Sequence, residues 1–508
     1  MLLFLFALLI PACSTSDKKI IKGRIIISGI TKGNILPAKG QEDSPYPGRD
    51  IGGSQFLASK IKSLSLEAKN KEMFPIYVDI GDAFSGSPEA LFTRGKAVME
   101  VFNLLPLEMM LIGNFDFTIG TSMLRNLSKN TNFPLLASNI RTDSEKFFKE
   151  SIILNRGGLK IAFLGQVPPD TPQMTLPENI QNLKFIASDS LLIDMATRLK
   201  KNSGVHIVIL LSQKNFERSS DFEAFKTQNA IDLVIALDYQ KEIVQPFKFG
   251  NTWVKLISGY NRGRELDFVD FEYRFGYEPG QSATFRNGGR FPLLNDSIEP
   301  DPGMVNLISN YVRKIDQLKS REIGTIAYNL TRAYEKESPL GNFITDAMRF
   351  ATGVSIAFQN SGAIQNDLRK GVISEGDLYT AIPFENSLIT IDLSGVEIMR
   401  ILEISSARRA GVLQVSGINY SYSTKKNIGK RVEIVKIEGK ELDLKKNYSV
   451  AINDFLYRGG DGFTPFKNGK NFKIWGSLRE AVRDYLVQSS DKTTTNYAEP
   501  QGRINEIK

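Results

Sequence analysis

Short apolar runs alternate with longer polar segments along the first part of the chain. They predict buried strands at residues 25–27, 76–80, 109–112, 135–136, 159–164, 205–211 and 232–236. A continuous run of β-branched and aliphatic residues that ends in a polar loop is typical of a strand covered on both faces. The pattern therefore indicates an α/β layered domain whose functional loops follow the strand ends.

A different periodicity begins after the proline-rich stretch at residues 299–303. Val305, Ile308, Val312 and Ile315 recur at intervals of three and four, which predicts an amphipathic helix with a clear start. We expect this helix to link two domains.

The helix divides the chain into a domain at residues 22–300, a linker at 301–322 and a second domain at 323–508. The second part mixes helix and strand signals, so it is expected to be α+β. Its helix signals lie at residues 341–350 and 395–407, and its strand signals at 355–358, 388–392 and 448–452.

The composition is that of a globular protein with more than one core. The chain has 508 residues, of which 42% are hydrophobic and 24% are charged. Its net charge of +8 comes from basic residues that are scattered, which favours a solvated surface over a nucleic acid polymer as partner. After the first dozen residues no apolar run reaches the ~18 residues that span a bilayer.

The first 13 residues form an apolar stretch that ends in Ala12 and Cys13. This pattern is typical of a lipoprotein signal peptide, after whose removal Cys13 carries acyl chains that anchor an exported protein at the periplasmic face or cell surface. A signal peptide cut elsewhere is the alternative. Cys13 is the only cysteine in the chain, so disulfides and thiolate metal sites are excluded.

Five phrases follow one another in the second part: ESPLGNFITDAM at 337–348, QNSGAIQ at 359–365, IPFEN at 382–386, LQVSG at 413–417 and NDFLYRGGDGF at 453–463. In order and spacing they resemble the 5'-nucleotidase C-terminal domain. Upstream, VDIGDAFSGS at 78–87, IGNFDF at 112–117, FPLLASN at 133–139 and LLS at 210–212 resemble the metallophosphoesterase domain of the same family. The resemblance implies a layered β-sandwich flanked by helices, followed by an α+β substrate-binding domain.

The resemblance also implies a centre of two divalent metals held by Asp, His and Asn ligands. In this sequence only Asp82 and Asn114 match its first ligands, because the expected Asp and His of the first loop are Ile30 and Lys32. The catalytic His and the Asp that follow the matching Asn are replaced by Phe115 and Thr118, and two later imidazoles are replaced by Gln213 and by the Leu237–Gln240 segment.

The chain has one histidine, His206, which lies in an apolar run and is expected to be structural. No cofactor is firmly predicted, although an all-oxygen site built from Asp82, Asn114 and Asp238 could hold one hard divalent cation such as Mg²⁺ or Ca²⁺. Alternatively, Asp82 and Asn114 cap loops by bonding backbone amides.

The residues that bind the base are better preserved. Two aromatic rings can sandwich a base while a polar group fixes the ribose, and the resemblance places these roles at Phe384, Phe455 and Asp461, with Asn360 and Asn386 as nearby polar contacts. Core packing of the rings and an ordinary turn at Asp461 are the alternatives. Gln365 stands where the family has an arginine that would bind phosphate, which favours a nucleoside over a nucleotide unless Arg332 or Arg369 compensates.

Three functions follow from these observations. The leading hypothesis is an exported lipoprotein of the family that is catalytically degenerate and binds a nucleoside or nucleotide. The second is an active metal-dependent 5'-nucleotidase that hydrolyses extracellular nucleotides, and the third is a pure protein-interaction scaffold. The sequence leaves open the base, the oligomeric state, partner proteins and the membrane that carries the anchor.

Overall fold

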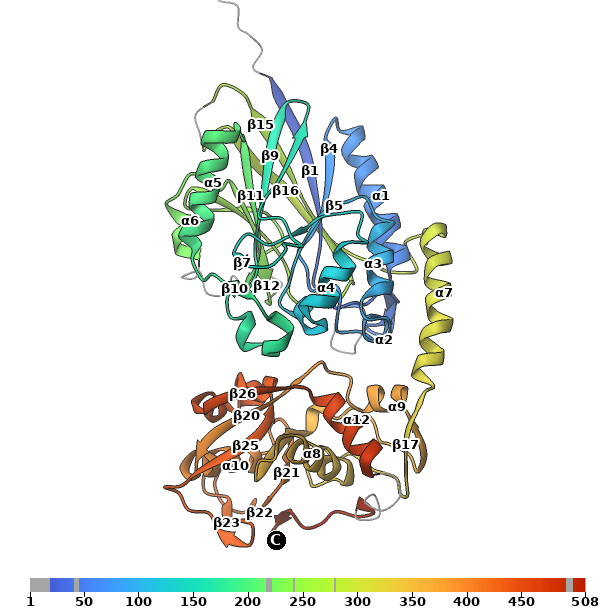
Figure 1. Ribbon diagram of the computed structural model, residues 1–508, viewed down its shortest axis with the longest axis vertical. Coiled ribbons are helices and arrows are strands. Elements are labelled where there is room, and N and C mark those ends of the chain that lie inside the picture. Colours follow the sequence, from blue (N-terminus) through green and yellow to red (C-terminus); the bar gives the residue numbers. More distant parts are fainter. Residues whose placement is uncertain are drawn as a thin grey trace, which may run out of the picture.

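The computed structural model describes residues 19–40, 45–215, 222–240, 243–277, 280–489 and 497–507. Within these ranges the chain folds into an N-terminal domain, above in Figure 1, and a C-terminal domain below it. The predicted signal peptide and Cys13 lie outside the described residues. No helix in the described part is both long and apolar enough to cross a membrane.

The N-terminal domain is built on two six-stranded sheets, which contain all seven predicted strands. The first has the order β16 (Ala283–Pro292), β15 (Glu265–Arg274), β1 (Ile20–Ser28), β4 (Phe74–Asp79), β5 (Leu107–Leu111) and β6 (Leu135–Leu136). The second has the order β13 (Phe247–Phe249), β14 (Thr252–Ser258), β12 (Leu233–Asp238), β11 (Ile207–Asn215), β9 (Leu159–Gln166) and β8 (Ile152–Arg156). Two short pairs lie apart: β2 (Ala38–Lys39) with β3 (Asp50–Ile51), and β7 (Ile140–Thr142) with β10 (Leu183–Phe185).

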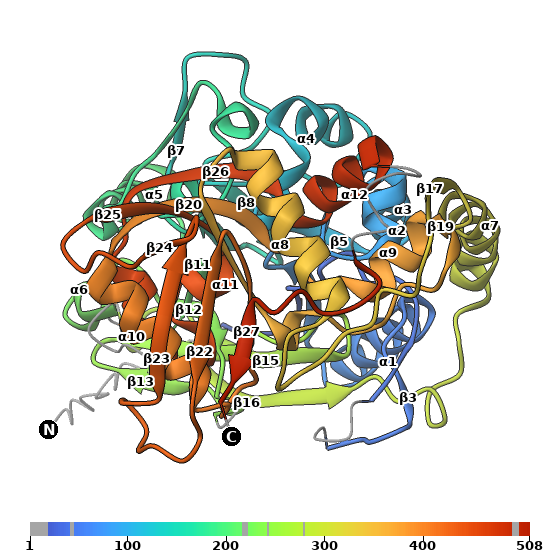
Figure 2. The same ribbon diagram turned by 90° about the horizontal axis from the view of Figure 1, so that it is seen from below.

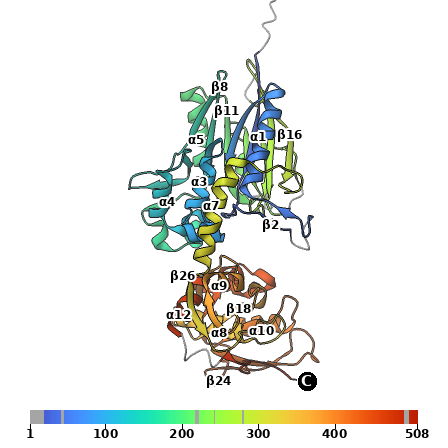
Figure 3. The ribbon, with the colours of Figure 1, turned by 90° about the vertical axis from the view of Figure 1, so that its right-hand side faces the viewer.

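The two sheets pack against each other with helices outside them (Figure 3). In β11, Ile207, Ile209 and Leu211 join the core shared with the first sheet, whereas Val208 and Leu210 join a second core beneath the outer helices. This alternation explains the continuous apolar run. The helices are α1 (Ser54–Asn70), α2 (Pro88–Thr93), α3 (Lys96–Asn103), α4 (Thr121–Ser128), α5 (Asp189–Ser203) and α6 (Glu223–Lys226). The predicted layered β-sandwich flanked by helices is confirmed.

The C-terminal domain is the predicted α+β arrangement (Figure 2). Its main sheet has the order β21 (Leu413–Ser416), β18 (Ile356–Asn360), β25 (Asn447–Asn453), β20 (Ser387–Ser394) and β26 (Lys470–Ser477). The helices are α8 (Pro339–Thr352), α9 (Glu375–Ala381), α10 (Gly395–Ser406), α11 (Asp454–Tyr457) and α12 (Leu478–Ser489). Smaller sheets pair β17 (Glu322–Ile326) with β19 (Gly371–Ser374), and join β24 (Lys440–Glu441), β23 (Val432–Ile437), β22 (Ile418–Tyr422) and β27 (Ile504–Glu506) in that order.

The predicted linker helix is α7 (Pro302–Lys319), which begins where Asp301 accepts the Met304 N–H at 2.9 Å. Its buried residues are Met304, Ile308, Tyr311 and Ile315, and they belong to the core of the N-terminal domain. The prediction of which residues this helix buries was therefore wrong at one position, since Val305 is exposed and Tyr311 is buried instead. The helix is part of the first domain and runs along its side toward the second (Figure 1).

Candidate functional site

The turns after β1 and β4 are joined by backbone hydrogen bonds. The Ile30 N–H donates to the Gly81 carbonyl and the Lys32 N–H donates to the Asp82 carbonyl, both at 2.8 Å. Ile30, Lys32 and Asp82 have φ values of 54°, 49° and 56°, which is rare outside glycine and is strained for a β-branched residue. The two turns therefore keep a costly backbone geometry that the packing enforces.

Lys32 and Asp82 form an ion pair where these turns meet. Lys32 Nζ donates to Asp82 Oδ2 at 2.6 Å, and the two side chains are 19% and 5% exposed. The ammonium also lies 3.0 Å from the centre of the Phe115 ring, a cation–π contact. Desolvation lowers the pKa of Lys32 and outweighs the opposing effect of the nearby Asp82 carboxylate. Because Asp82 Oδ1 accepts the Phe115 N–H at 3.0 Å, both carboxylate oxygens already have protein partners.

Two further buried carboxylates, which the sequence analysis did not single out, lie behind this pair. Asp116 accepts the backbone N–H groups of Asp82, Ala83, Phe84 and Gly113 at 2.8–3.0 Å. Asp79 accepts from Ser28 Oγ at 2.5 Å and from the Gly81 N–H at 2.8 Å. Burial raises the pKa of Asp116 to about 6 and that of Asp79 to about 7. Both carboxylates hold the turns in place.

Asn114 and Gln213 connect the turns further. The Asn114 N–H donates to Gln213 Oε1 at 3.3 Å, and Gln213 Nε2 donates to the Ile80 carbonyl at 2.8 Å. Gln213 thus ties strand ends together at a position where the resemblance expects an imidazole. Asp238 is the last residue of β12 rather than part of a loop; its Oδ1 accepts the Gln240 N–H, and its buried Oδ2 has no hydrogen-bond partner among the described residues.

A pocket of about 730 Å³ lies between the two domains, and the Lys32–Asp82 pair forms part of its wall. Aromatic pairs stand on both sides: Tyr239 and Tyr260 have ring centres 5.0 Å apart on the N-terminal domain, and Tyr457 and Phe472 are 4.8 Å apart on the C-terminal domain. The remaining polar lining includes Asn114, Gln213, Arg262, Asp454 and Arg458, whereas Asp238 does not line the pocket. A cavity of this size with a few polar groups among aromatic rings suits a small molecule.

Two predicted base-binding residues, Asn360 and Asp461, form one hydrogen-bonded unit with Asn453 in the C-terminal domain. Asn360 Nδ2 donates to Asp461 Oδ2 at 3.0 Å, and Asn360 Oδ1 accepts from Asn453 Nδ2 at 2.8 Å. Asn453 caps α11 by accepting the Leu456 N–H, and α11 carries Phe455. The Phe455 ring is 42% exposed and lies against Gly460, where a Cβ atom would come within 2.4 Å of the ring. Glycine is therefore needed for this ring position.

Phe384 is held in a neighbouring segment and is 38% exposed. The buried Arg479 guanidinium donates to the Phe384 carbonyl at 3.2 Å and fixes that segment. Two residues further on, Asn386 Nδ2 donates at 3.0 Å to Asp454 Oδ1, the residue before Phe455. The structure thus brings together the segments that carry both aromatic side chains. Arg479 and Asp454 were missed, although Asp454 lies inside one of the recognised phrases.

Comparison with known proteins identifies the C-terminal part of the chain. The model described as "5'-nucleotidase, C-terminal domain" matches residues 320–468. The C-terminal domain is therefore a 5'-nucleotidase C-terminal domain. Over most of its length the chain is similar to the snake venom 5'-nucleotidase of Naja atra, which is 27% identical over 494 residues that cover 86% of this chain and 90% of that protein.

Other similarities extend this picture of a 5'-nucleotidase fold. Endonuclease YhcR of Bacillus subtilis is 27% identical over 433 residues, which cover 80% of this chain and 34% of that protein, so the chain spans about a third of its length. The crystal structure of the NAD nucleotidase of Haemophilus influenzae has a TM-score of 0.71 at 20% identity, and the match covers 96% of this chain and 100% of that one. Its likeness is one of fold.

The two-metal centre implied by the resemblance to the 5'-nucleotidase family does not fit the residues of this chain. The described residues contain no group of three or more His, Cys, Asp or Glu side chains placed to hold a metal ion. His206 Nδ1 accepts the Lys160 N–H at 3.0 Å, and its ring packs on Tyr273 and Phe275. A single metal at Asp82, Asn114 and Asp238 would have to displace the Lys32 ammonium from Asp82.

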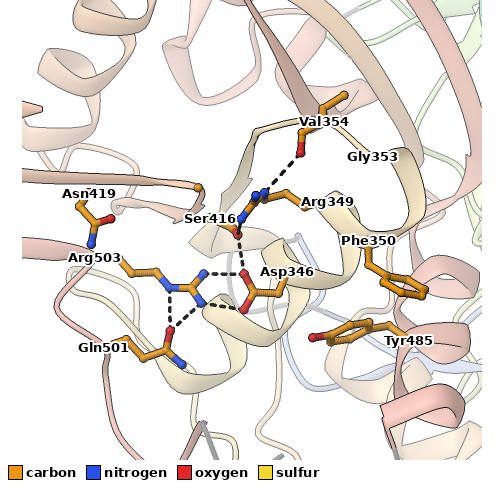
Figure 4. Close-up of a pocket in the computed structure, with 11 residues that line it drawn as sticks. Asp346, Arg349, Phe350, Gly353, Val354, Ser416, Asn419, Tyr485, Gln501 and Arg503 are labelled. Atoms are coloured by element: carbon orange, nitrogen blue, oxygen red, sulfur yellow. Dashed lines mark hydrogen bonds and ion pairs between the residues drawn. The ribbon is translucent and has the colours of Figure 1, made fainter. Parts of the chain in front are cut away.

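A second hollow of about 720 Å³ lies on the C-terminal domain (Figure 4). Its charged groups pair with one another, since both terminal nitrogens of Arg503 donate to Asp346 at 2.6–2.8 Å and Ser416 bridges Asp346 and Arg349. The pairing fastens the C-terminal segment to α8, so we assign these residues a structural role.

Proposed function

We propose that this chain is an exported 5'-nucleotidase-family lipoprotein that has lost metal-dependent hydrolysis and binds a nucleoside or nucleotide. The observation that carries this proposal is the Lys32–Asp82 ion pair. An ammonium 2.6 Å from the carboxylate would repel a divalent metal ion and already occupies the oxygen that the metal would bind. Without metals there is neither a clamp for phosphoryl oxygens nor a metal-bound hydroxide.

Ligand binding is supported by the solvent exposure of two aromatic side chains. Phe384 and Phe455 are 38% and 42% exposed, so their faces are accessible to a flat base. Asp461, beside Phe455, is positioned by Asn360 and could accept hydrogen bonds from ribose hydroxyls. Export is supported by the apolar N-terminus with Cys13 and by the venom origin in the name of the Naja atra relative.

The alternative is an active hydrolase, as the name of that 5'-nucleotidase relative suggests. Two observations favour it: Asp238 Oδ2 is buried and has no hydrogen-bond partner in the described part of the chain, and Asp82 and Asn114 line the pocket. Under this alternative, a single divalent cation would replace the Lys32 ammonium and bind oxygen ligands only.

Measuring phosphate release from a panel of nucleotides distinguishes a binding protein without hydrolytic activity from an active hydrolase. Protein lacking residues 1–13 would be assayed with and without Mg²⁺, Mn²⁺, Co²⁺ and Zn²⁺, beside an Asp82→Ala variant. We expect no metal-dependent turnover. Turnover that Asp82→Ala abolishes would overturn the proposal in favour of the hydrolase.

Adenosine titration tests the binding role against a pure interaction scaffold. Saturating adenosine should raise the melting temperature, because a ligand at 100 times its Kd stabilises the native state by about 2.7 kcal/mol. Phe455→Ala should abolish this shift, whereas Phe350→Ala, which removes another exposed ring of the same domain, should leave it unchanged. No shift in the unsubstituted protein would favour the scaffold.

A further inference from the structure

The Lys32 ammonium has an N–H group that can donate a hydrogen bond to a ligand. An ammonium group has three N–H donors, and here one donates to Asp82 Oδ2 while the charge also lies over the Phe115 ring. Lys32 Nζ has no other hydrogen-bond acceptor among the described residues, and the side chain lines the interdomain pocket. One donor is therefore available on the pocket side.

A second cation comes from a distant part of the sequence. The Arg262 N–H donates to the Ile30 carbonyl at 2.9 Å, which places Arg262 on the same strained turn as Lys32. Arg262 is exposed in the same pocket, and within the described part of the chain its guanidinium makes no ion pair or side-chain hydrogen bond. Its charge acts on Lys32, because it contributes to the lowering of the Lys32 pKa.

Lys32 and Arg262 line the same pocket as Asp82, Asp170 and Asp454, and Asp82 is the carboxylate that contacts Lys32. The carboxylate of Asp82 has both oxygens engaged, by Lys32 and by the Phe115 N–H. The neighbouring Asp116 accepts four backbone N–H groups. The local excess of positive charge favours an anion.

We propose that Lys32 and Arg262 form a metal-independent binding site for a phosphate group, with the tethered ammonium of Lys32 supplying the positive charge that a metal ion would supply. Charge-assisted hydrogen bonds from an ammonium and a guanidinium are suited to phosphate oxygens. Lys32 and Arg262 both have left-handed backbone geometry, at φ 49°, and a backbone hydrogen bond from Arg262 to Ile30 joins their turns.

This site deepens the proposed function, on which it rests for the assignment of a nucleotide. Phe384, Phe455 and Asp461 are not among the residues that line the interdomain pocket, whereas Asp454, next to Phe455, is. Gln365 cannot supply the charged phosphate contact expected from the C-terminal domain, and its Nε2 donates to the Gly362 carbonyl. Lys32 and Arg262 would supply that contact from the opposite domain. The ligand would then be a phosphate monoester, either a nucleotide or a phosphate compound without a base.

The test is calorimetric titration of the protein with inorganic phosphate in the presence of EDTA. We expect binding that EDTA leaves unchanged and that weakens about tenfold in Arg262→Gln, as expected for the loss of one charge-assisted hydrogen bond. The double variant Lys32→Met with Asp82→Asn leaves no unpaired charge and should bind phosphate at least about tenfold more weakly. Lys214→Gln is the control, because Lys214 lines the same pocket but donates to both oxygens of Asp189.

Three results would overturn the proposal: no phosphate binding, binding that requires an added divalent metal, or unchanged affinity in the Lys32→Met with Asp82→Asn variant. Titration with AMP identifies the source, since tighter binding than inorganic phosphate assigns a nucleotide and equal binding assigns a phosphate compound without a base. Adenosine is titrated in parallel. If phosphate binds and adenosine does not, the proposal that the protein binds a nucleoside is wrong, whereas the proposal of a phosphate site at Lys32 and Arg262 is supported.

Discussion

Lys32 Nζ and Asp82 Oδ2 lie 2.6 Å apart at one end of the interdomain pocket, and both belong to turns with left-handed backbone geometry. A cation that is part of the chain cannot be removed by a chelator. In this structure a cation of the chain itself thus occupies a carboxylate that the resemblance assigns to a metal ion.

The pair should contribute measurably to stability. Lys32→Met alone leaves the 5% exposed Asp82 carboxylate without its counter-charge, which should lower the free energy of unfolding by about 3 kcal/mol. Adding Asp82→Asn should recover most of that loss, and urea denaturation of the unsubstituted protein, both single variants and the double variant gives the coupling. Lys39→Met, in an exposed pair with Asp50, should have no measurable effect. A cost in the double variant equal to the sum of the two single costs would show that the pair is not coupled.

Stability should fall as the pH rises from about 4 to about 7 through the effect of Asp79. Its pKa is raised by burial from 3.8 to about 7, so in this window the folded state holds a proton that the unfolded state has released. This contribution is fully present below the unfolded pKa and is lost as the pH passes the folded pKa. Asp79→Asn should flatten the curve of melting temperature against pH. A smaller slope should remain in the Asp79→Asn variant, because Asp116 has a pKa raised to about 6. If the curve of this variant matches that of the unsubstituted protein, Asp79 is not the group responsible.

Gly460→Ala should impair base binding without altering the backbone. The added Cβ would lie 2.4 Å from the Phe455 ring, so the ring must move. Adenosine affinity should drop about tenfold, as expected when one base–aromatic stacking contact is lost. Gly362→Ala is the matched control, because its nearest neighbour atom is 3.7 Å away. Equal adenosine affinity in both variants would show that the Phe455 ring position does not matter.

Arg479→Gln should release the segment that carries Phe384. The guanidinium is 7% exposed and binds the Glu385 carboxylate at 2.7 Å as well as backbone carbonyls of this segment, and its loss should cost about 3 kcal/mol of unfolding free energy. Adenosine affinity should also fall. Arg483→Gln should retain both properties, because Arg483 lies on the same helix and, among the described residues, its ion pair is with the exposed Asp484. A stable Arg479→Gln protein with full adenosine affinity would refute this role.

Apolar patterning predicted strands wherever both faces of a strand are covered by apolar residues, as in β11. It gave no sign of β14, β15 or β16, because these strands bury charges. Lys255 and Asp267 are both 0% exposed and pair at 2.8 Å, and Arg24 pairs with Asp270 at 2.6 Å. Each charge makes its own position look solvent-exposed in the sequence, and only the partner from another strand makes its burial tolerable.

The site was predictable to the extent that its residues lie in short phrases. Asp82 and Asn114, which line the interdomain pocket, lie in such phrases, whereas Arg262 follows no such phrase and reaches the Lys32 turn through one backbone hydrogen bond. The mismatch with the expected metal ligands could be recognised from the single histidine and from Lys32, Phe115 and Gln213 at ligand positions. Its ion pair with Asp82 required the two turns to be placed together, which no spacing along the chain reveals.

Helix α7 ends at Lys319 as part of the first core, and β17 of the second domain begins at Glu322. Within the described residues the chain passes between the domains at Ser320 and Arg321. Apart from this short connection, the two domains are joined by noncovalent contacts between separate cores. A ligand that binds Lys32 on one wall of the pocket and the C-terminal domain on the other would add further noncovalent contacts between the two domains.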